Sequence, residues 1–172
     1  MRVCFVNRYC HPDHSATSQI LSDLAVGLAE KGWAVSIVAS RQRYDDPSVS
    51  LPAHERWRGV DIHRIWTTRF GRANLVGRAI DYLTFYLLLP WRLFWLLRRG
   101  GAVVAMTDPP LVSLVVAPVA WLRGARLVNW LQDVFPEVVV SLGEPPLPRR
   151  MAWLLRKLRN ASLRMEIGRA HV

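Results

Sequence analysis

The chain has 172 residues, of which 51% are hydrophobic, and a formal net charge of +10. This length allows one well-buried core and excludes two ordinary domains. The strong positive charge favours anionic partners: nucleic acid, phospholipid or a phosphorylated small molecule. The two cysteines, Cys4 and Cys10, indicate reduced thiols of a cytosolic protein and not a disulfide framework.

Hydrophobic periodicity predicts strands that alternate with helices. Short apolar runs predict strands at residues 2–7, 34–39, 60–65, 102–106 and 125–130. Helical spacing predicts helices from residue 19 to Gly32 and at about 75–98 and 110–122, while residues 41–58 are expected to run over the surface. This alternation predicts an α/β fold, a Rossmann-like doubly wound and mainly parallel sheet with helices on both faces.

The first turn between strand and helix, residues 11–18, contains no glycine. A dinucleotide fingerprint needs glycines there, so a nicotinamide or flavin cofactor is disfavoured. Hydroxyl side chains at a helix N-terminus, Ser15, Thr17 and Ser18, are compatible with an anion held by free N–H groups. Ser18 could equally do no more than cap a helix that begins at Gln19. Both interpretations stay open.

The segment 75–97 is rich in aromatic and leucine side chains but contains Arg78, Asp81 and Arg92, and Pro90 is expected to kink it. Its uncharged stretch is about half of the roughly 20 residues that a spanning helix needs, so it is not expected to cross a membrane. Tryptophans beside arginines are typical of helices that lie in the headgroup region, but the aromatics could also pack on the sheet.

A second basic amphipathic stretch lies at residues 149–159, where Met151, Leu154, Leu155 and Leu158 form one stripe among arginines. It favours a membrane surface, because no motif of a nucleic-acid-binding fold accompanies it and nucleic acid is not expected as a partner. A separate cluster of possible metal ligands, Cys10, His11, Asp13 and His14, has no second ligand group elsewhere in the chain, so no metal is expected.

Acidic residues follow the last predicted strand, where Asp133 and Glu137 flank Pro136. In an open α/β sheet, ligands bind at the carboxyl ends of strands, which makes Asp133 a site candidate. The same residues could instead cap the next helix, with Pro136 in its first turn.

Several motifs, in the same order along the chain, are similar to a known family. They are YCHPDHSATS at residues 9–18, DLA at 23–25, SRQRYDDP at 40–47, TDPP at 107–110 and WLQDVFPE at 130–137. Over residues 1–143 the chain resembles the N-terminal half of a bacterial family-four glycosyltransferase of the GT-B type, in the branch that builds colanic acid, capsule and O-antigen.

The resemblance implies an enzyme that moves a sugar from a nucleotide-sugar donor to an acceptor, with retention of anomeric configuration. The acceptor is expected to be a polyprenyl-diphosphate-linked saccharide, which places the protein in the cytoplasm, peripheral at the inner face of the inner membrane. In this family the N-terminal domain mainly holds the acceptor and the C-terminal domain holds the donor. No metal and no cofactor are implied.

The resemblance also implies roles for individual residues. The turn Ser15, Ala16 and Thr17 would face the donor phosphates through backbone N–H groups, although the Gly-Gly pair of many relatives is missing here. Asp133 would be the catalytic carboxylate. The acceptor would contact His11, His14, Thr107, Asp108 and Glu137. Lipid phosphates or the membrane would contact Arg64, Arg69, Arg72, Trp91, Arg92 and Trp95, of which the first three could equally form a solvated basic face.

A family member continues into a second domain that carries a pair of glutamates for the donor, and nothing in this chain matches it. Residues 166–172 are similar to a translated sequencing adapter, so we expect an incomplete domain at 1–165, a foreign tail at 166–172 and no turnover by the chain alone. The alternative is a stand-alone basic module that binds membrane surfaces or polyanions without catalysis. A complete small enzyme is disfavoured, since no nucleophile–base pair or glycine-rich phosphate loop is present.

Overall fold

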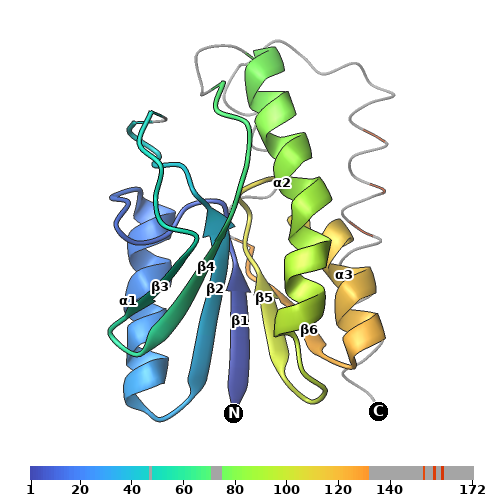
Figure 1. The fold of residues 1–172 in the computed structure, drawn as a ribbon. Coiled ribbons are helices and arrows are strands. Elements are labelled where there is room, and N and C mark those ends of the chain that lie inside the picture. The colour runs from blue at the N-terminus through green and yellow to red at the C-terminus, as the bar shows by residue number, and fades with distance from the viewer. Residues whose placement is uncertain (47, 71–74, 132–152, 154–156, 158–159, 161–172) are drawn as a thin grey trace.

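The computed structural model describes residues 1–46, 48–70 and 75–131, together with Trp153, Lys157 and Asn160. Six strands form one sheet in the order β3-β4-β2-β1-β5-β6 (Figure 1). The strands are β1 (Arg2–Val6), β2 (Ala34–Ser40), β3 (His54–Trp57), β4 (Val60–Ile65), β5 (Ala102–Ala105) and β6 (Arg126–Asn129). The helices are α1 (Ala16–Glu30), α2 (Leu75–Leu96) and α3 (Val112–Arg123).

The sheet is parallel except at one edge, where β3 pairs antiparallel with β4. In the centre, Phe5 of β1 lies opposite Ile37 of β2 and Val104 of β5. The central strands are apolar on both faces, which a parallel sheet needs when helices cover it from both sides. This mostly parallel six-stranded sheet with helices confirms the predicted α/β, Rossmann-like fold.

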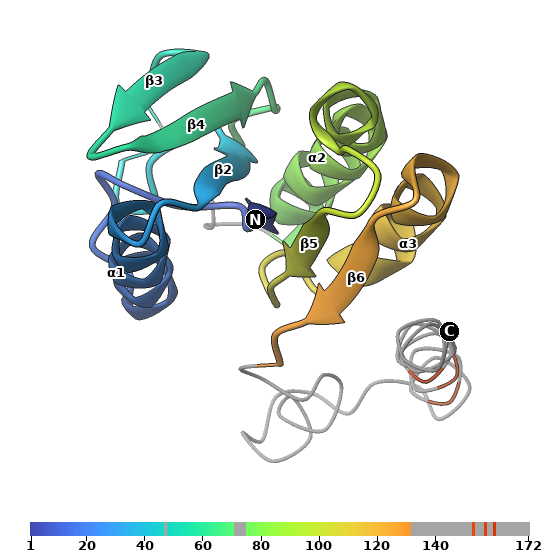
Figure 2. The same cartoon turned by 90° about the horizontal axis from the view of Figure 1, so that it is seen from below.

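The helices divide between the two faces of the sheet (Figure 2). α1 packs on one face, where Leu21 and Ala25 join Phe5 and Ile37 in one core cluster. α2 and α3 cover the other face, and their buried side chains meet the opposite sides of the same strands. The second cluster includes Val6, Val38, Val103, Phe85, Leu89 and Val116.

The helix α1 begins three residues earlier than predicted. Ser15, not Ser18, occupies the N-cap position, with extended backbone and no capping hydrogen bond from its side chain. Ser18 is buried inside the helix, in line with Leu21, Ser22 and Ala25. Ser18 thus belongs to the buried stripe of α1 that faces the sheet, at spacing i, i+3, i+4, i+7 with these three residues. This helical spacing already includes Ser18, so the helix begins before it.

The edge strand β3 lies where a surface excursion was expected at residues 41–58, so that expectation was wrong for its last part. Arg58 and Gly59 form a two-residue connection to β4, and their φ angles are 46° and 84°. Positive φ at both central residues is the signature of a type I′ hairpin turn. The sequence at this turn is Arg-Gly and not the favoured Asn-Gly, which concealed the hairpin.

The helix α2 has 22 residues and contains Pro90. Within the part of the chain that the structure describes, no helix has both the length and the apolar character to cross a bilayer. Several predicted features lie outside the described residues: Arg72, Asp133, Glu137, most of the basic stretch at 149–159 and the tail at 166–172.

Candidate functional site

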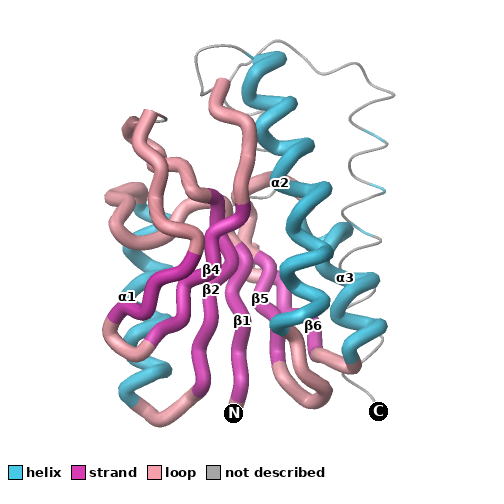
Figure 3. The backbone as a smooth tube through the Cα atoms, viewed as in Figure 1, coloured by secondary structure: helices cyan, strands magenta, loops and turns pink. Residues whose placement is uncertain are grey.

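The sheet has a topological switch point between β1 and β5. The chain leaves β1 through α1 towards β2 on one side, whereas α2 leads from β4 to β5 on the other side, across the opposite face. The loops that follow the strands gather above the carboxyl edge of the sheet (Figure 3). Such a point is where open α/β sheets bind ligands.

A cavity of about 400 Å³ lies at this switch point. Its described lining comes from the segments that follow β1 and β5, the N-terminus of α1, the segment after β2 and one turn of α2. These residues are Arg8, Tyr9, Ser15, Ala16, Thr17, Tyr44, Tyr82, Thr107, Asp108 and Pro110. The volume falls in the range of pockets that bind small molecules.

Backbone hydrogen bonds fix the floor of this cavity. The N–H of Arg8 donates to the carbonyl of Asp108 at 2.7 Å, which ties the end of β1 to the end of β5. The N–H of Ser40 donates to the carbonyl of Arg8 at 2.9 Å, which ties in the end of β2. Three strand ends therefore hold one another in place below the site.

The guanidinium of Arg8 forms a buried wall of the cavity. Arg8 is 2% exposed, and its Nη2 lies 3.2 Å from Oδ2 of Asp81 and donates to Oε1 of Gln42 at 3.0 Å. The guanidinium carbon also lies 5.1 Å and 4.9 Å from the ring centroids of Tyr9 and Tyr82. One buried cation thus orients two tyrosine rings that line the site.

Asp81 connects this wall to the loop after β4. Its Oδ1 accepts hydrogen bonds from Oγ1 of Thr68 at 2.7 Å and from the N–H of Phe70 at 3.1 Å. Gln42 also donates to the carbonyl of Thr68. A buried carboxylate is stable only when its charge is paired and its oxygens are hydrogen-bonded, and both conditions hold for Asp81.

The N-terminus of α1 forms another side of the cavity through Ser15, Ala16 and Thr17. The first turn of a helix has backbone N–H groups without intrahelical partners and a partial positive charge. Ser15 makes no capping hydrogen bond with its side chain. This wall is therefore suited to an anionic or strongly hydrogen-bonding part of a ligand.

The third kind of lining group combines aromatic rings with a carboxylate. Burial and the nearby Asp108 both raise the pKa of Tyr82, so its hydroxyl stays protonated and can donate a hydrogen bond. Tyr86, one turn further along α2, donates its hydroxyl to the carbonyl of Pro110 and holds the loop after β5. Thr107 and Asp108 add a hydroxyl and a carboxylate that are half-buried.

Five of the predicted site residues meet in this cavity. Ser15, Ala16 and Thr17 arrive from α1, and Thr107 and Asp108 from the end of β5. Sequence reasoning missed the other lining residues, above all Arg8 and Tyr9. Their signal was present, because they directly follow the first predicted strand and the rule of strand ends applies to β1 as it does to β5.

The two predicted acceptor histidines are not among the described residues that line the cavity. His11 stacks on Trp57 of β3, with ring centroids 3.9 Å apart, and burial lowers its pKa. His14 is exposed. Both histidines follow β1 in the same loop as the cavity residue Tyr9. His11 lies against β3, and His14 is exposed to solvent.

The prediction that Arg64 contacts lipid phosphates or the membrane was wrong. Arg64 is buried, and its Nη2 lies 2.8 Å from Oε2 of Glu55 and donates to the carbonyl of His11 at 2.6 Å. The alternation of β4 explains this placement, since Arg64 shares a face with the buried Val60 and Ile62. Its charge holds β3 and the loop after β1 together.

The other predicted basic and aromatic residues divide between surface and interior. Arg69 is exposed, and so are Trp91 and Trp95 on α2. Arg92 is half-buried, and its Nη2 lies 2.6 Å from Nδ1 of His63 on β4. Arg92 therefore faces the sheet. Arg72 is outside the described residues.

The residues with metal-ligand side chains near the N-terminus serve the loop structure. Both carboxylate oxygens of Asp13 accept from the N–H of Tyr44, at 2.9 and 3.0 Å. Cys10 is buried, and this burial raises the pKa of its thiol to about 12. Among the described residues, no group of three or more His, Cys, Asp or Glu side chains could hold a metal ion.

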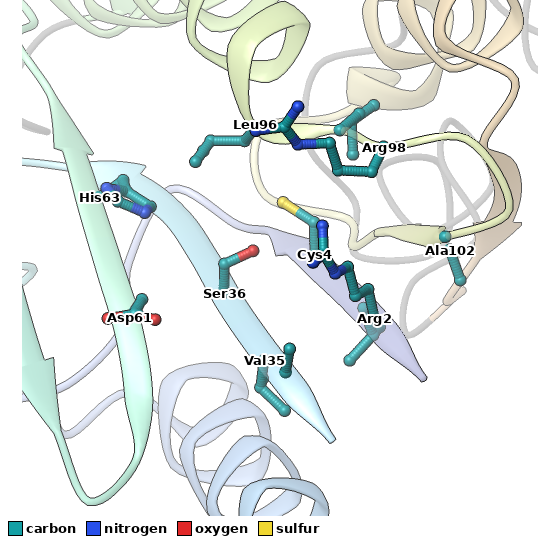
Figure 4. Close-up of a pocket in the computed structure, with 13 residues that line it drawn as sticks. Arg2, Cys4, Val35, Ser36, Asp61, His63, Leu96, Arg98 and Ala102 are labelled. Carbon is teal, nitrogen blue, oxygen red and sulfur yellow. The ribbon is translucent and has the colours of Figure 1, made fainter. Parts of the chain in front are cut away.

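A second cavity of about 200 Å³ lies at the opposite end of the strands (Figure 4). The residues around it include Arg2, Cys4, Asp61, His63 and Arg98, and none of the predicted site residues lines it. Because ligands of open α/β sheets bind at the carboxyl ends of strands, the switch-point cavity is the candidate functional site.

No family model and no curated protein matches this chain.

Proposed function

We propose that this chain is the acceptor-binding domain of a retaining glycosyltransferase, which moves a sugar from a nucleotide-sugar donor to a lipid-linked saccharide in bacterial surface polysaccharide synthesis. The observation that carries the proposal is the meeting of Thr107 and Asp108 with the N-terminus of α1 in the cavity between β1 and β5. The order of motifs along the chain supports the same assignment.

The lining suits a sugar ring. Tyrosine rings offer flat apolar faces to the C–H groups of a saccharide, and Thr107 and Asp108 offer a hydroxyl and a carboxylate to its hydroxyl groups. A carboxylate held within hydrogen-bond reach can orient an acceptor hydroxyl and accept its proton. Asp133, which lies outside the described residues, stays the predicted catalytic carboxylate.

The anionic part of the reaction would lie against α1. The backbone N–H groups around Ser15, Ala16 and Thr17 are suited to the phosphates of a donor, without a metal. The donor nucleotide itself would bind mainly to a second domain. We therefore expect the residues that line this cavity to bind the saccharide acceptor.

Saccharide binding tests the proposal directly. The probes are simple hexoses, N-acetylhexosamines and their 1-phosphates. Their binding to the purified chain is measured by ligand-observed NMR. Binding of at least one of these probes is expected. Asp108→Asn and Thr107→Val should each weaken it about tenfold, since the first removes the negative charge and one acceptor oxygen and the second removes the hydroxyl.

Asp61→Asn is the matched control, because Asp61 lines the other cavity and the substitution is chemically the same. Its affinity should equal that of the unchanged chain. The proposal fails if no saccharide binds, or if Asp108→Asn and Asp61→Asn bind equally well.

A further inference from the structure

The outward side of α2 carries a continuous apolar stripe. Its members recur at spacing i, i+4, i+7, i+11, i+15 and i+18, which places them on one face of the helix. Their side chains are between 37% and 70% exposed. We call this set the outer stripe: Val76, Ile80, Leu83, Leu87, Trp91 and Phe94. It runs the length of a 22-residue helix, which is about 33 Å.

The opposite side of the same helix is fully used by the core. Phe85, Leu89 and Leu93 are completely buried against the sheet and α3. The inner side of α2 alone therefore accounts for its packing on the sheet, which was one of the two interpretations of this segment. It does not account for the outer stripe, and exposed apolar surface of this extent marks an interaction site.

The C-terminal end of α2 widens the stripe with aromatic side chains. Trp95 is 60% exposed and lies edge-on to both Trp91 and Phe94, with ring centroids 5.8 and 5.6 Å apart. The end of α3 lies alongside, since the guanidinium of Arg123 sits 4.8 Å from the ring centroid of Phe94. Indole rings near guanidinium groups are typical of side chains at the level of lipid headgroups.

The chain segment that carries the outer stripe has exposed charges of one sign. Between Asp61 and Asp108 the sequence contains a single acidic residue, Asp81, and that residue is completely buried in its ion pair with Arg8. Exposed arginines come before and after the helix in the chain, Arg69 before it and Arg99 after it. An apolar face with a cationic border is complementary to an anionic lipid surface.

We propose that the outer stripe of α2 docks this protein on an anionic lipid bilayer, with the helix lying flat in the headgroup region. Leu83, Leu87 and Trp91 would enter the boundary of the acyl chains, while the arginines at the ends meet lipid phosphates. A second copy fits the surface less well, because two cationic borders would repel each other. The proposal rests on the proposed function for its biological setting, since a lipid-linked acceptor is what brings the enzyme to a membrane.

Vesicle flotation tests the docking surface. The purified chain should float with vesicles of phosphatidylcholine that contain about 30% phosphatidylglycerol, and binding to pure phosphatidylcholine should be much weaker. Leu83→Gln with Leu87→Gln should lower the binding at least tenfold, because both substitutions remove aliphatic surface that would enter the boundary of the acyl chains. Arg69→Gln with Arg99→Gln should remove most of the preference for the anionic lipid.

The matched control is Ile20→Gln with Leu24→Gln. These two aliphatic side chains are 49% and 39% exposed on α1, which covers the other face of the sheet. Their replacement should leave vesicle binding unchanged. Equal losses in the α1 and α2 variants would overturn the assignment of the surface.

Depth of insertion gives a second, independent measurement. Lipids brominated on the acyl chains should quench part of the tryptophan fluorescence of the bound chain. The variant Trp91→Phe with Trp95→Phe keeps the apolar character of the surface, so it should still float but lose most of this quenching. Quenching that persists in this variant would show that other indoles enter the bilayer and would refute the proposed orientation.

Light scattering separates the lipid surface from a second copy. A monomer that floats with anionic vesicles is the expected result. A dimer that the Leu83 and Leu87 substitutions convert to a monomer, together with no vesicle binding by the unchanged chain, would assign the outer stripe to self-association. No sugar or nucleotide enters these experiments, so their failure is distinct from a failure of saccharide binding.

Discussion

Arg8 shows how one residue can join the interior of the protein to its cavity. Its backbone holds the ends of β2 and β5, and its guanidinium pairs with Asp81 inside the protein. Neither charge is more than 2% exposed. A buried pair of this kind adds little net stability as a pair, but removing one partner leaves an uncompensated charge away from water.

Asp81→Asn should therefore destabilise the protein by about 3 to 5 kcal/mol, because it leaves the Arg8 guanidinium buried without its counter-ion. Urea unfolding followed by tryptophan fluorescence measures the change. The control is Glu30→Gln, since Glu30 belongs to an exposed pair with Arg58 at 3.5 Å. That change should stay within about 0.5 kcal/mol.

A double variant makes this prediction independent of whether Asp81→Asn folds well. Replacing both charges, as Arg8→Met with Asp81→Met, leaves no unpaired ion and should be less destabilising than Asp81→Asn alone. A double variant that is less stable than the single one would show that the hydrogen bonds of Asp81, and not the buried charge of Arg8, dominate the effect.

His63 is a second residue whose environment decides its protonation. Burial, followed by the neighbouring guanidinium of Arg92, lowers its pKa from 6.5 to about 4. Below pH 6.5 the unfolded chain binds a proton at this position, whereas the folded chain stays neutral until about pH 4. Protons thus favour the unfolded state in this window, and stability is lost as the pH falls through it.

Unfolding free energies at pH 7 and pH 4.5 should reveal this coupling. The unchanged chain should lose about 1 to 2 kcal/mol more than His63→Gln between these two values, after allowance for solvent screening of a half-buried group. Parallel losses in the unchanged chain and in His63→Gln would rule out the effect.

Among the elements, the β3–β4 hairpin is the one that the sequence concealed. Its turn places Arg58 at a φ of 46°, where a residue with a Cβ is strained, and Gly59 at 84°, where glycine is at ease. The strand itself, His54–Trp57, contains three polar residues in four. Both the turn residues and the strand composition thus lack the usual signals of a hairpin.

Substitutions in this turn have predictable signs. Arg58→Asn should stabilise the protein by about 0.5 to 1 kcal/mol, because asparagine tolerates left-handed backbone better. Gly59→Ala should destabilise it by at least about 1 kcal/mol, since its Cβ would be strained and would lie 3.4 Å from the Cβ of Ala29. Urea unfolding measures both changes.

Gly27→Ala provides the contrasting control for glycine replacement. Gly27 lies within α1, and a Cβ there meets nothing within 4 Å. The helix should become more stable by about 0.5 to 1 kcal/mol. If Gly27→Ala and Gly59→Ala change stability in the same direction, the turn geometry is not what requires glycine at position 59.

At the scale of the whole molecule, the sequence was sufficient for most of the architecture. Apolar residues located the five parallel strands within one or two residues. The central strands β1, β2 and β5 are nearly continuous apolar runs because they are buried on both faces, whereas β4 alternates apolar with polar residues and β6 has polar residues at both ends. Periodicity located the three helices for a similar reason. The edge strand β3 escaped because it is exposed and polar, so its place depends on pairing with β4 and not on its own composition.

The candidate site was only partly predictable. Thr107 and Asp108 follow an apolar run, so the rule of strand ends found them. The same rule applies to Arg8, which follows β1, but it was not used there. Tyr82 belongs to the cavity only because α2 crosses over the end of β1, which is a long-range contact that no local pattern encodes. Arg64 misled in the other direction, since an arginine on a short strand suggests a solvated charge and not a buried ion pair.

Tyr82 and Leu83 are neighbours in α2, and together they define the distance between the cavity and the outer stripe. Tyr82 lines the cavity, and Leu83 belongs to the outward side of the same helix turn. A helix with its side chains is about 10 to 12 Å thick. A lipid that is anchored in a bilayer against the outer stripe would therefore need a link of about this length to place its sugar in the cavity. The thickness of one helix would thus favour acceptors whose sugar is separated from the lipid anchor by only a short link.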